Sequence, residues 1–235
     1  MENAAHDSKK WRTIFLLYMI FSSLVLIGLV ISVYQLSNQK IIRAEGIVIH
    51  DSDNTDRILI GAPIPFSYDR VRTDTSKVRK YWGVKYGEEY MKAYNNYHHG
   101  TNGIIVLNKE GFDKVVLGEN LTDPNTGKRI AEITGMVWND DLGYERGGAG
   151  LNKLFENQKY RTGFGLDDEG GEGLHSVILE DGSKFIRIAY NEGYLLIGRA
   201  NANNPFFQNK EEFVGIMVRD TKDSLIYKTN FLSPQ

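Results

Sequence analysis

The sequence predicts an all-β domain of antiparallel hairpins, tethered by one N-terminal transmembrane helix and carrying one helical insertion. Three observations predict this fold: a charge-free apolar run, a recurring glycine-led strand–turn–strand unit, and an aromatic stripe at helical spacing. We expect a sandwich or a rolled meander. Because the unit starts recur at short intervals, a β-solenoid of about 28 residues per unit is the alternative.

The apolar run occupies residues 14–34 and predicts a membrane anchor. About twenty residues at roughly 1.5 Å rise each match the hydrocarbon core of a bilayer. The run is longer than the core of a signal peptide and lacks a small-residue cleavage site, so we expect it to remain uncleaved. Lys9, Lys10 and Arg12 precede it. This excess of cations favours a cytoplasmic tail at residues 1–13 and an extracytoplasmic C-terminal domain.

The recurring unit begins with glycine and about three mostly apolar residues, continues through turn-forming residues, and returns as a second strand. Residues 35–45 are expected to be a linker or a first strand, and residues 46–232 the β-rich domain. Short runs of Val, Ile and aromatic residues favour strands, and Asp, Asn and Gly between them favour hairpin turns. The unit begins at Gly46, Gly103, Gly135, Gly163 and Gly215.

Acidic side chains fill several of the predicted turns and are the main candidate catalytic groups. The candidates are Asp140, Asp141, Asp167, Asp168 and Glu172. Two carboxylates facing one cleft are what a glycosidase requires. Turn chemistry explains the same residues without catalysis, because other copies of the unit place different residues in this slot. A cleft lined by Trp138 or Tyr144 would favour the enzyme interpretation.

A second acidic turn, from Asp51 to Asp56, resembles the start of a calcium-binding loop. Asp51, Asp53 and Asp56 place carboxylates near one another, as a hard cation requires. The turn lacks the glycine at the sixth position and the distal glutamate of a helix-flanked calcium loop. We therefore predict a solvated hairpin turn and no metal site.

Composition excludes several other functions. The chain has 28 Lys and Arg against 30 Asp and Glu, which argues against a nucleic-acid partner. It has no cysteine, which excludes disulfides, thiol catalysis and cysteine-bound zinc. The glycine-rich stretches 147–150 and 169–173 are followed by no helix pattern, so no phosphate-binding loop and no cofactor is expected.

The segment between the first two units differs in composition and predicts a helix at about residues 73–99. Trp82, Tyr86, Tyr90 and Tyr94 recur every four residues, which places them on one face of a helix. An amphipathic helix that packs this face on the sheet is one interpretation. The other is a surface that binds a protein partner, since Tyr and Trp contribute strongly to such surfaces.

Two stretches carry a resemblance to a family. Arg57–Pro63, RILIGAP, and Asn139–Gly148, NDDLGYERGG, look like segments of uncharacterised bacterial membrane-anchored β-hairpin-repeat proteins. The resemblance spans about residues 41–200 and leaves the aromatic insertion unmatched. It implies a bacterial envelope setting and transfers no activity.

These observations together predict a membrane-anchored, non-enzymatic envelope protein. We expect it to be a binding or assembly module for a protein partner or a membrane complex, with the bilayer contacted through residues 14–34. A membrane-tethered hydrolase that acts on glycans is the alternative.

Overall fold

The computed structural model describes residues 2–37, 41, 43–94, 96–97, 100–121, 131–169 and 171–232. The chain divides into two compact units, Met1–Ala44 and Glu45–Gln235. Each unit is described by itself.

The first unit is one long helix, α1 (Glu2–Ser37). Within it, Trp11–Gln35 has a mean hydropathy of 2.8 and is long and apolar enough to cross a membrane. None of this stretch is buried against other parts of the protein. An apolar surface of this length without a protein partner is consistent with a single-pass anchor, and the predicted span at residues 14–34 lies inside it.

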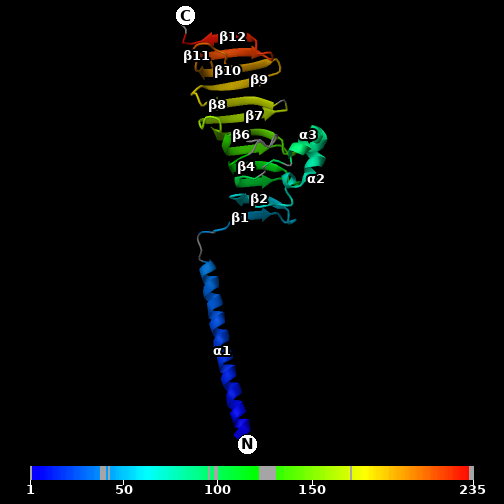
Figure 1. The fold of residues 1–235 in the computed structure, drawn as a ribbon, viewed down its shortest axis with the longest axis vertical. Helices are drawn as coiled ribbons and strands as arrows, with labels where there is room; N and C mark the ends of the chain where they lie inside the picture. The colour runs from blue at the N-terminus through cyan, green and yellow to red at the C-terminus, as the bar shows by residue number, and fades with distance from the viewer. Residues whose placement is uncertain are drawn as a thin grey trace. The chain divides into compact units, whose positions relative to one another are not determined.

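The second unit is built on one antiparallel sheet whose twelve strands follow one another in sequence order (Figure 1). Each inner strand pairs with the strand before it and the strand after it, and β1 and β12 form the two edges. Residues 43–45 carry no strand, and the first strand begins at Gly46. The strands are β1 (Gly46–His50), β2 (Asp56–Gly61), β3 (Asn102–Leu107), β4 (Asp113–Glu119), β5 (Ala131–Asn139), β6 (Glu145–Leu154), β7 (Tyr160–Asp168), β8 (Gly171–Ile178), β9 (Lys184–Tyr190), β10 (Gly193–Ala200), β11 (Phe213–Asp220) and β12 (Leu225–Asn230).

This architecture confirms the all-β class with an apolar N-terminal helix and one helical insertion. The strand order is the expected meander of hairpins, whereas the expected second layer or closure is not seen among the described strands. The described strands form a single open sheet, so they make neither a two-layer sandwich nor a closed roll. The solenoid alternative is wrong because every pairing is antiparallel. Most connections are tight turns, which return each strand beside its predecessor and leave no crossover to start a second layer.

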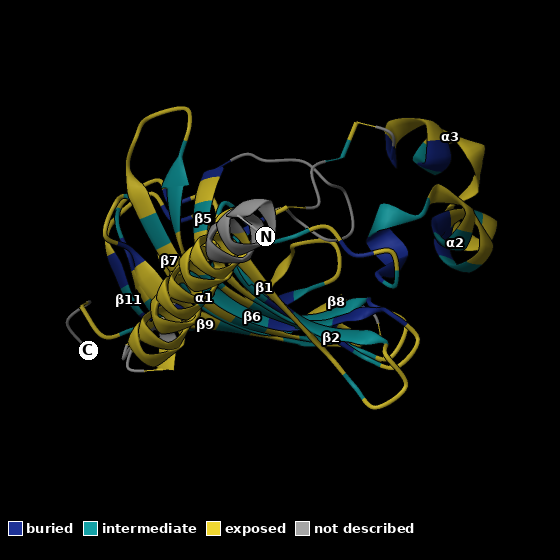
Figure 2. Cartoon of the chain, turned by 90° about the horizontal axis from the view of Figure 1, so that it is seen from below, coloured by how far each residue is buried: buried dark blue, intermediate teal, exposed yellow. Residues whose placement is uncertain are grey.

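The glycines that open the repeated unit align across the sheet. A Cβ atom added at Gly103 would lie 1.9 Å from the carbonyl oxygen of Leu117, and one at Gly135 would lie 2.1 Å from that of Ala149. Side chains are excluded here because the backbone of the neighbouring strand approaches too closely. The sheet is bent rather than flat (Figure 2), and a row of glycines permits such bending. The register places in one row Gly46, Gly61, Gly103, Gly118, Gly135, Gly150 and Gly163.

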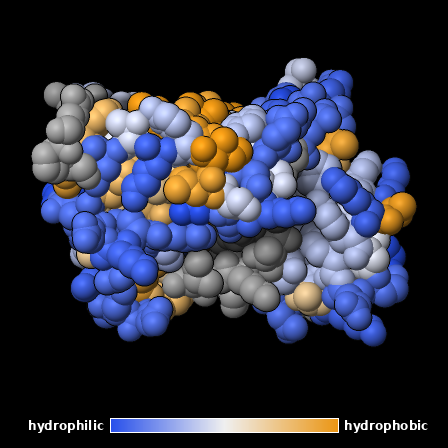
Figure 3. Space-filling view, turned by 90° about the horizontal axis from the view of Figure 1, so that it is seen from above, coloured by the Kyte–Doolittle hydropathy of each residue, from blue (hydrophilic) through white to orange (hydrophobic). Residues whose placement is uncertain are grey.

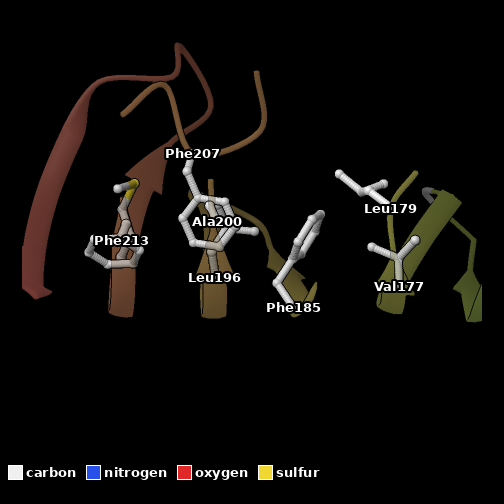
Figure 4. Packing of buried hydrophobic residues seen from close by; sticks show 8 residues of the cluster. Val177, Leu179, Phe185, Leu196, Ala200, Phe207 and Phe213 are labelled. Atoms are coloured by element: carbon white, nitrogen blue, oxygen red, sulfur yellow. The ribbon is translucent and has the colours of Figure 1, made fainter. Parts of the chain in front are cut away.

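One face of the sheet, called here the covered face, carries the buried core at both ends of the stack. Over β8 to β11, Phe207 from the loop after β10 packs on strand side chains such as Phe185, Leu196 and Phe213 (Figure 4). Over β2 to β4, Ile64 packs on Leu59, Ile105 and Leu107. The segments that follow β2 and β10 therefore cover this face in place of a second sheet.

The helical insertion lies beside the ends of the strands near β2 to β6 (Figure 1). Asp74 caps its first α-helix by accepting hydrogen bonds from the backbone N–H groups of Ser76 and Lys77, at 2.8 and 3.2 Å. Gly87, with φ of 80°, interrupts the last helix. The predicted helix at about 73–99 is therefore a series of short turns, and residues 95, 98 and 99 lie outside the described residues. The elements are η1 (Val71–Thr73), α2 (Thr75–Val78), η2 (Arg79–Gly83) and α3 (Val84–Tyr94).

Candidate functional site

Asp140 and Asp141 lie in the β5–β6 turn, and their contacts are those of turn residues. Asp140 Oδ1 accepts hydrogen bonds from the backbone of Leu142 and Tyr144, and Asp140 Oδ2 lies 2.9 Å from Arg146 Nη2. The Asp141 side chain is 91% exposed and pairs with Lys114 at 2.8 Å, which holds the pKa of its carboxyl below 3.8. The structure does not bring these two carboxylates into a cleft.

The turn from Asp51 to Asp56 is likewise held together by its own side chains. Asp51 Oδ1 accepts hydrogen bonds from the backbone N–H groups of Asp53 and Thr55. The Thr55 hydrogen bond, with help from Arg57, lowers the pKa of Asp51. Asp53 pairs with Lys109 at 3.5 Å, and the backbone of Asp56 donates to Asp69. Within the described part of the chain, no three His, Cys, Asp or Glu side chains form a group that could hold a metal ion.

The β7–β8 hairpin brings Asp167 and Glu172 together. They are cross-strand partners and both line a pocket of about 450 Å³ on the covered face. Burial, followed by the charge of Glu172, raises the pKa of Asp167 above 3.8. His175 Nδ1 and Arg187 Nη1 lie 3.8 and 3.7 Å from Glu172 Oε2. Asp168 does not line this pocket, and its carbonyl oxygen accepts a hydrogen bond from Arg146.

Glycine forms the floor of this pocket. Gly148 and Gly150 from β6 and Gly163 and Gly165 from β7 line it, together with apolar side chains from β5. Because these four neighbouring positions have no side chains, the surface of the sheet is hollowed there. The sequence shows the acidic hairpin and the glycine-rich strands separately. That they line one pocket depends on the strand register, which the sequence does not show.

The two aromatic residues proposed to line a catalytic cleft lie elsewhere. Trp138 packs against Phe164, with ring centroids 6.0 Å apart, on the sheet face opposite the pocket. Tyr144 packs against Tyr86 of the insertion, and Lys85 lies 4.3 Å from the Tyr144 ring centroid. None of the described residues that line the pocket is a Trp, Tyr or Phe, the side chains that usually stack on a sugar ring.

The aromatic stripe of the insertion divides into buried and exposed residues. Trp82 and Tyr94 are 3% and 5% exposed, so they belong to the insertion's own core around Phe112. Tyr86 is 44% exposed and Tyr90 is half-buried, and burial raises the pKa of the Tyr90 phenol to about 12. Of the four residues predicted to bind a partner, Tyr86 and Tyr90 have solvent-exposed surface that a partner could contact.

Buried ion pairs fix the insertion to the sheet. Arg70 and Arg72 both reach Asp113 at the start of β4, and all three side chains are buried. Trp82 is held at the adjoining turn by a hydrogen bond from its Nε1 to the carbonyl oxygen of Leu142, at 2.9 Å. This network has no signature in the sequence, because charged residues far apart in the chain carry no periodic signal.

The largest candidate surface is the sheet face opposite the covered face, called here the open face. The register places apolar residues on it in every strand, and fourteen of them, on nine of the strands, are between 36% and 57% exposed. A single sheet with one uncovered apolar face is unusual, because sheets normally bury this face against another layer. The exposed members are Ile47, Ile49, Leu117, Met136, Leu151, Tyr160, Phe164, Leu166, Ile178, Ile186, Ile188, Tyr190, Ile197 and Tyr227.

Apolar side chains also gather at the end of the stack. Seen from the end that carries β12, they reach the surface between polar ones (Figure 3). Leu225 and Ile226 in this edge strand are 50% and 62% exposed. Exposed apolar edge strands are a known route to strand pairing between chains. The edge strand β12 is therefore a second candidate contact surface beside the open face.

Comparison with known proteins adds no relative: no family model, no curated protein and no solved structure matches the chain.

Proposed function

We propose that this chain is a membrane-anchored, non-enzymatic binding or assembly module, whose sheet contacts a protein partner through the open face. The observation that carries the proposal is the series of exposed apolar side chains along the open face, with members on nine of the twelve strands. A monomeric protein rarely exposes an apolar patch larger than about 300–600 Å². Fourteen apolar side chains, each about 40% exposed, amount to an area on the order of 1,000 Å².

The acidic turns support a binding role over catalysis. Asp51, Asp140 and Asp141 are engaged by backbone N–H groups or by a neighbouring cation, as turn-stabilising residues are. The aromatic insertion adds Tyr86 and Tyr90 at most, because Trp82 and Tyr94 hold the insertion together.

The proposed setting is a bacterial envelope, with residues 1–13 in the cytoplasm and the sheet outside. The cation excess before α1 supports this orientation. The absence of native cysteine makes it directly testable. A single cysteine at Ser224, in the β11–β12 turn, should react with an impermeant maleimide on intact cells, and one at Ser8 should react only after lysis. The reverse pattern would place the sheet in the cytoplasm.

Photo-crosslinking in membranes tests the binding role. A photoreactive residue is placed at Phe164 or Ile186 on the open face, and the matched control is placed at Phe155, which is 47% exposed in the β6–β7 turn. We expect protein adducts from the two open-face positions and none from Phe155. Equal labelling at all three positions, or none at the open-face positions, would reject the open face as the binding surface.

A membrane-tethered glycan hydrolase is the second candidate, and the Asp167–Glu172 pocket favours it. A carboxyl with a raised pKa beside a second carboxylate matches the acid and base of a glycosidase. The assay is release of reducing ends from cell-wall glycan by the full chain in detergent. Activity that is lost in Asp167→Asn and Glu172→Gln and retained in Asp141→Asn would establish the hydrolase function. An inactive wild-type chain would reject it.

A further inference from the structure

We infer that the occupant of the open face is a second copy of this chain, so that two sheets pack face to face into a sandwich. The inference rests on the proposed binding role and specifies its partner. Four features of the molecule support it: the length of chain left over, the area to be buried, the charges on the face, and the anchor.

The described segments that follow β2 and β10 pack on the covered face and leave the open face exposed. The longest internal stretch outside the described residues is 122–130. Fully extended, its nine residues span about 30 Å, and both ends are fixed at β4 and β5. Twelve strands spaced about 4.8 Å apart extend over roughly 50 Å. A stretch of this length is too short to span the open face, which favours cover by another molecule.

The exposed area suits a stable dimer. Each partner in a standard protein interface contributes about 800 Å², and the open face offers on the order of 1,000 Å² of apolar surface. The surface is also the right shape, because twisted sheets pack face to face at about 10 Å separation with a small angle between their strands. Two copies related by a twofold axis would each supply the same patch.

The charges on the open face neither repel a second copy nor select a charged partner. Glu132 and Lys153 pair across β5 and β6 at 3.5 Å. Arg199 in β10 pairs with Glu212. The register also places the exposed Glu119 in β4 and Lys184 in β9 on this face. Both signs of charge are therefore available for pairing when two such faces meet. A partner chosen by electrostatic complementarity would require a net charge on this face.

The anchor raises the effective concentration of the second copy. Two chains tethered in one bilayer search a thin layer rather than a volume, which favours even a modest interface. Other occupants, such as a different protein or lipid acyl chains, lack a feature on the molecule that selects them.

The test uses the full chain in detergent micelles and in its membrane. We expect the wild-type chain to have twice the protomer mass by light scattering corrected for detergent. Phe164→Glu should reduce the mass to one protomer, because it buries a charge at the centre of the interface. Phe155→Glu, the same substitution in the neighbouring turn, should leave the dimer intact. Thermal unfolding of each variant verifies folding.

A second measurement does not depend on a destabilising charge. The single-cysteine variant Phe164→Cys, treated with a flexible bismaleimide in membranes, should give a covalent dimer, whereas Phe155→Cys should not. A monomeric wild-type chain, or a dimer unaffected by Phe164→Glu, would overturn the inference.

The masses of the photo-crosslinked adducts distinguish this failure from failure of the proposed function. Adducts of twice the chain mass support the second copy. Adducts of any other mass at Phe164 reject the second copy and leave a binding module. Absence of adducts rejects both.

Discussion

Arg70 and Asp113 lie 43 positions apart in the sequence and form a buried, two-pronged ion pair. Arg70 Nε and Nη2 lie 2.7 Å from Oδ1 and Oδ2 of Asp113, and Arg72 Nε lies 3.0 Å from the same Oδ2. Burial alone would lower the pKa of Arg70, but the carboxylate outweighs it and raises the pKa. The pair connects the segment before the helical insertion to the start of β4, and so fixes the insertion to the sheet.

Removing Asp113 should therefore destabilise the domain strongly. Asp113→Ala leaves two guanidinium groups buried without their carboxylate, and we expect a loss of about 3–5 kcal/mol in the free energy of unfolding. Urea denaturation of the full chain in detergent measures it. Asp141→Ala removes an exposed ion pair from the neighbouring turn and should change little. Equal effects of the two variants would show that the buried network does not hold the insertion.

The glycine row predicts a contrast between two glycines on the same face. Gly135→Ala should destabilise the sheet by about 1–3 kcal/mol, because the new methyl group meets the Ala149 carbonyl oxygen and the strands must move apart. Gly165→Ala should have a much smaller effect, because the nearest atoms to its added Cβ lie 3.9 Å away. Denaturation midpoints of the two variants provide the measurement. A tolerated Gly135→Ala would show that the strands are not in close contact there.

The raised pKa of Asp167 predicts a pH-dependent effect of its removal. A carboxyl whose pKa is higher in the folded state than in the unfolded state lowers stability as pH rises above 3.8. Asp167→Asn should therefore raise the melting temperature at pH 7, and this gain should shrink as pH falls toward 3.8. Glu169→Gln removes the same unit of charge from the adjoining turn and is the control. A gain of the same size in Glu169→Gln would assign the effect to net charge.

The insertion's aromatic residues should separate into two groups on substitution. Trp82→Ala should cost about 3–5 kcal/mol, since it removes a buried ring that contacts Phe112 and Arg72. Tyr86→Ala should leave stability nearly unchanged, because the side chain is 44% exposed. Thermal unfolding and partner crosslinking are measured on the same preparations. Loss of crosslinking in Tyr86→Ala, with unchanged stability, would extend the binding surface to the insertion.

The sequence contained enough information for the hairpins and too little for their assembly. Glycine-led units with acidic turns predicted the strand pairs. The alignment of Gly46 through Gly163 depends on the number of residues in every intervening turn, which strand propensity does not determine. The meeting of Asp167 with the glycine floor depends on the same register.

The hydrophobic pattern of the strands also does not show that one face of the sheet is exposed. Strands such as β3 and β4 are apolar on both faces, a pattern typical of strands buried on both sides. The sequence therefore predicted a second layer or a closed roll, whereas the chain supplies cover for one face only. Residues such as Met136 and Leu117 have the composition of a core and the exposure of a surface, and sequence periodicity cannot distinguish the two.

The sequential pairing of the twelve strands makes the domain extensible. Each strand contacts only its immediate predecessor and successor along the chain. The loss of one whole hairpin would therefore create only one new strand–strand pairing. Excision of β7 and β8, for example, would set β6 against β9 and shorten the stack by about 10 Å. A meander of this kind can change length in evolution by duplication or deletion of a unit without redesign of the remainder, as linear repeat arrays do.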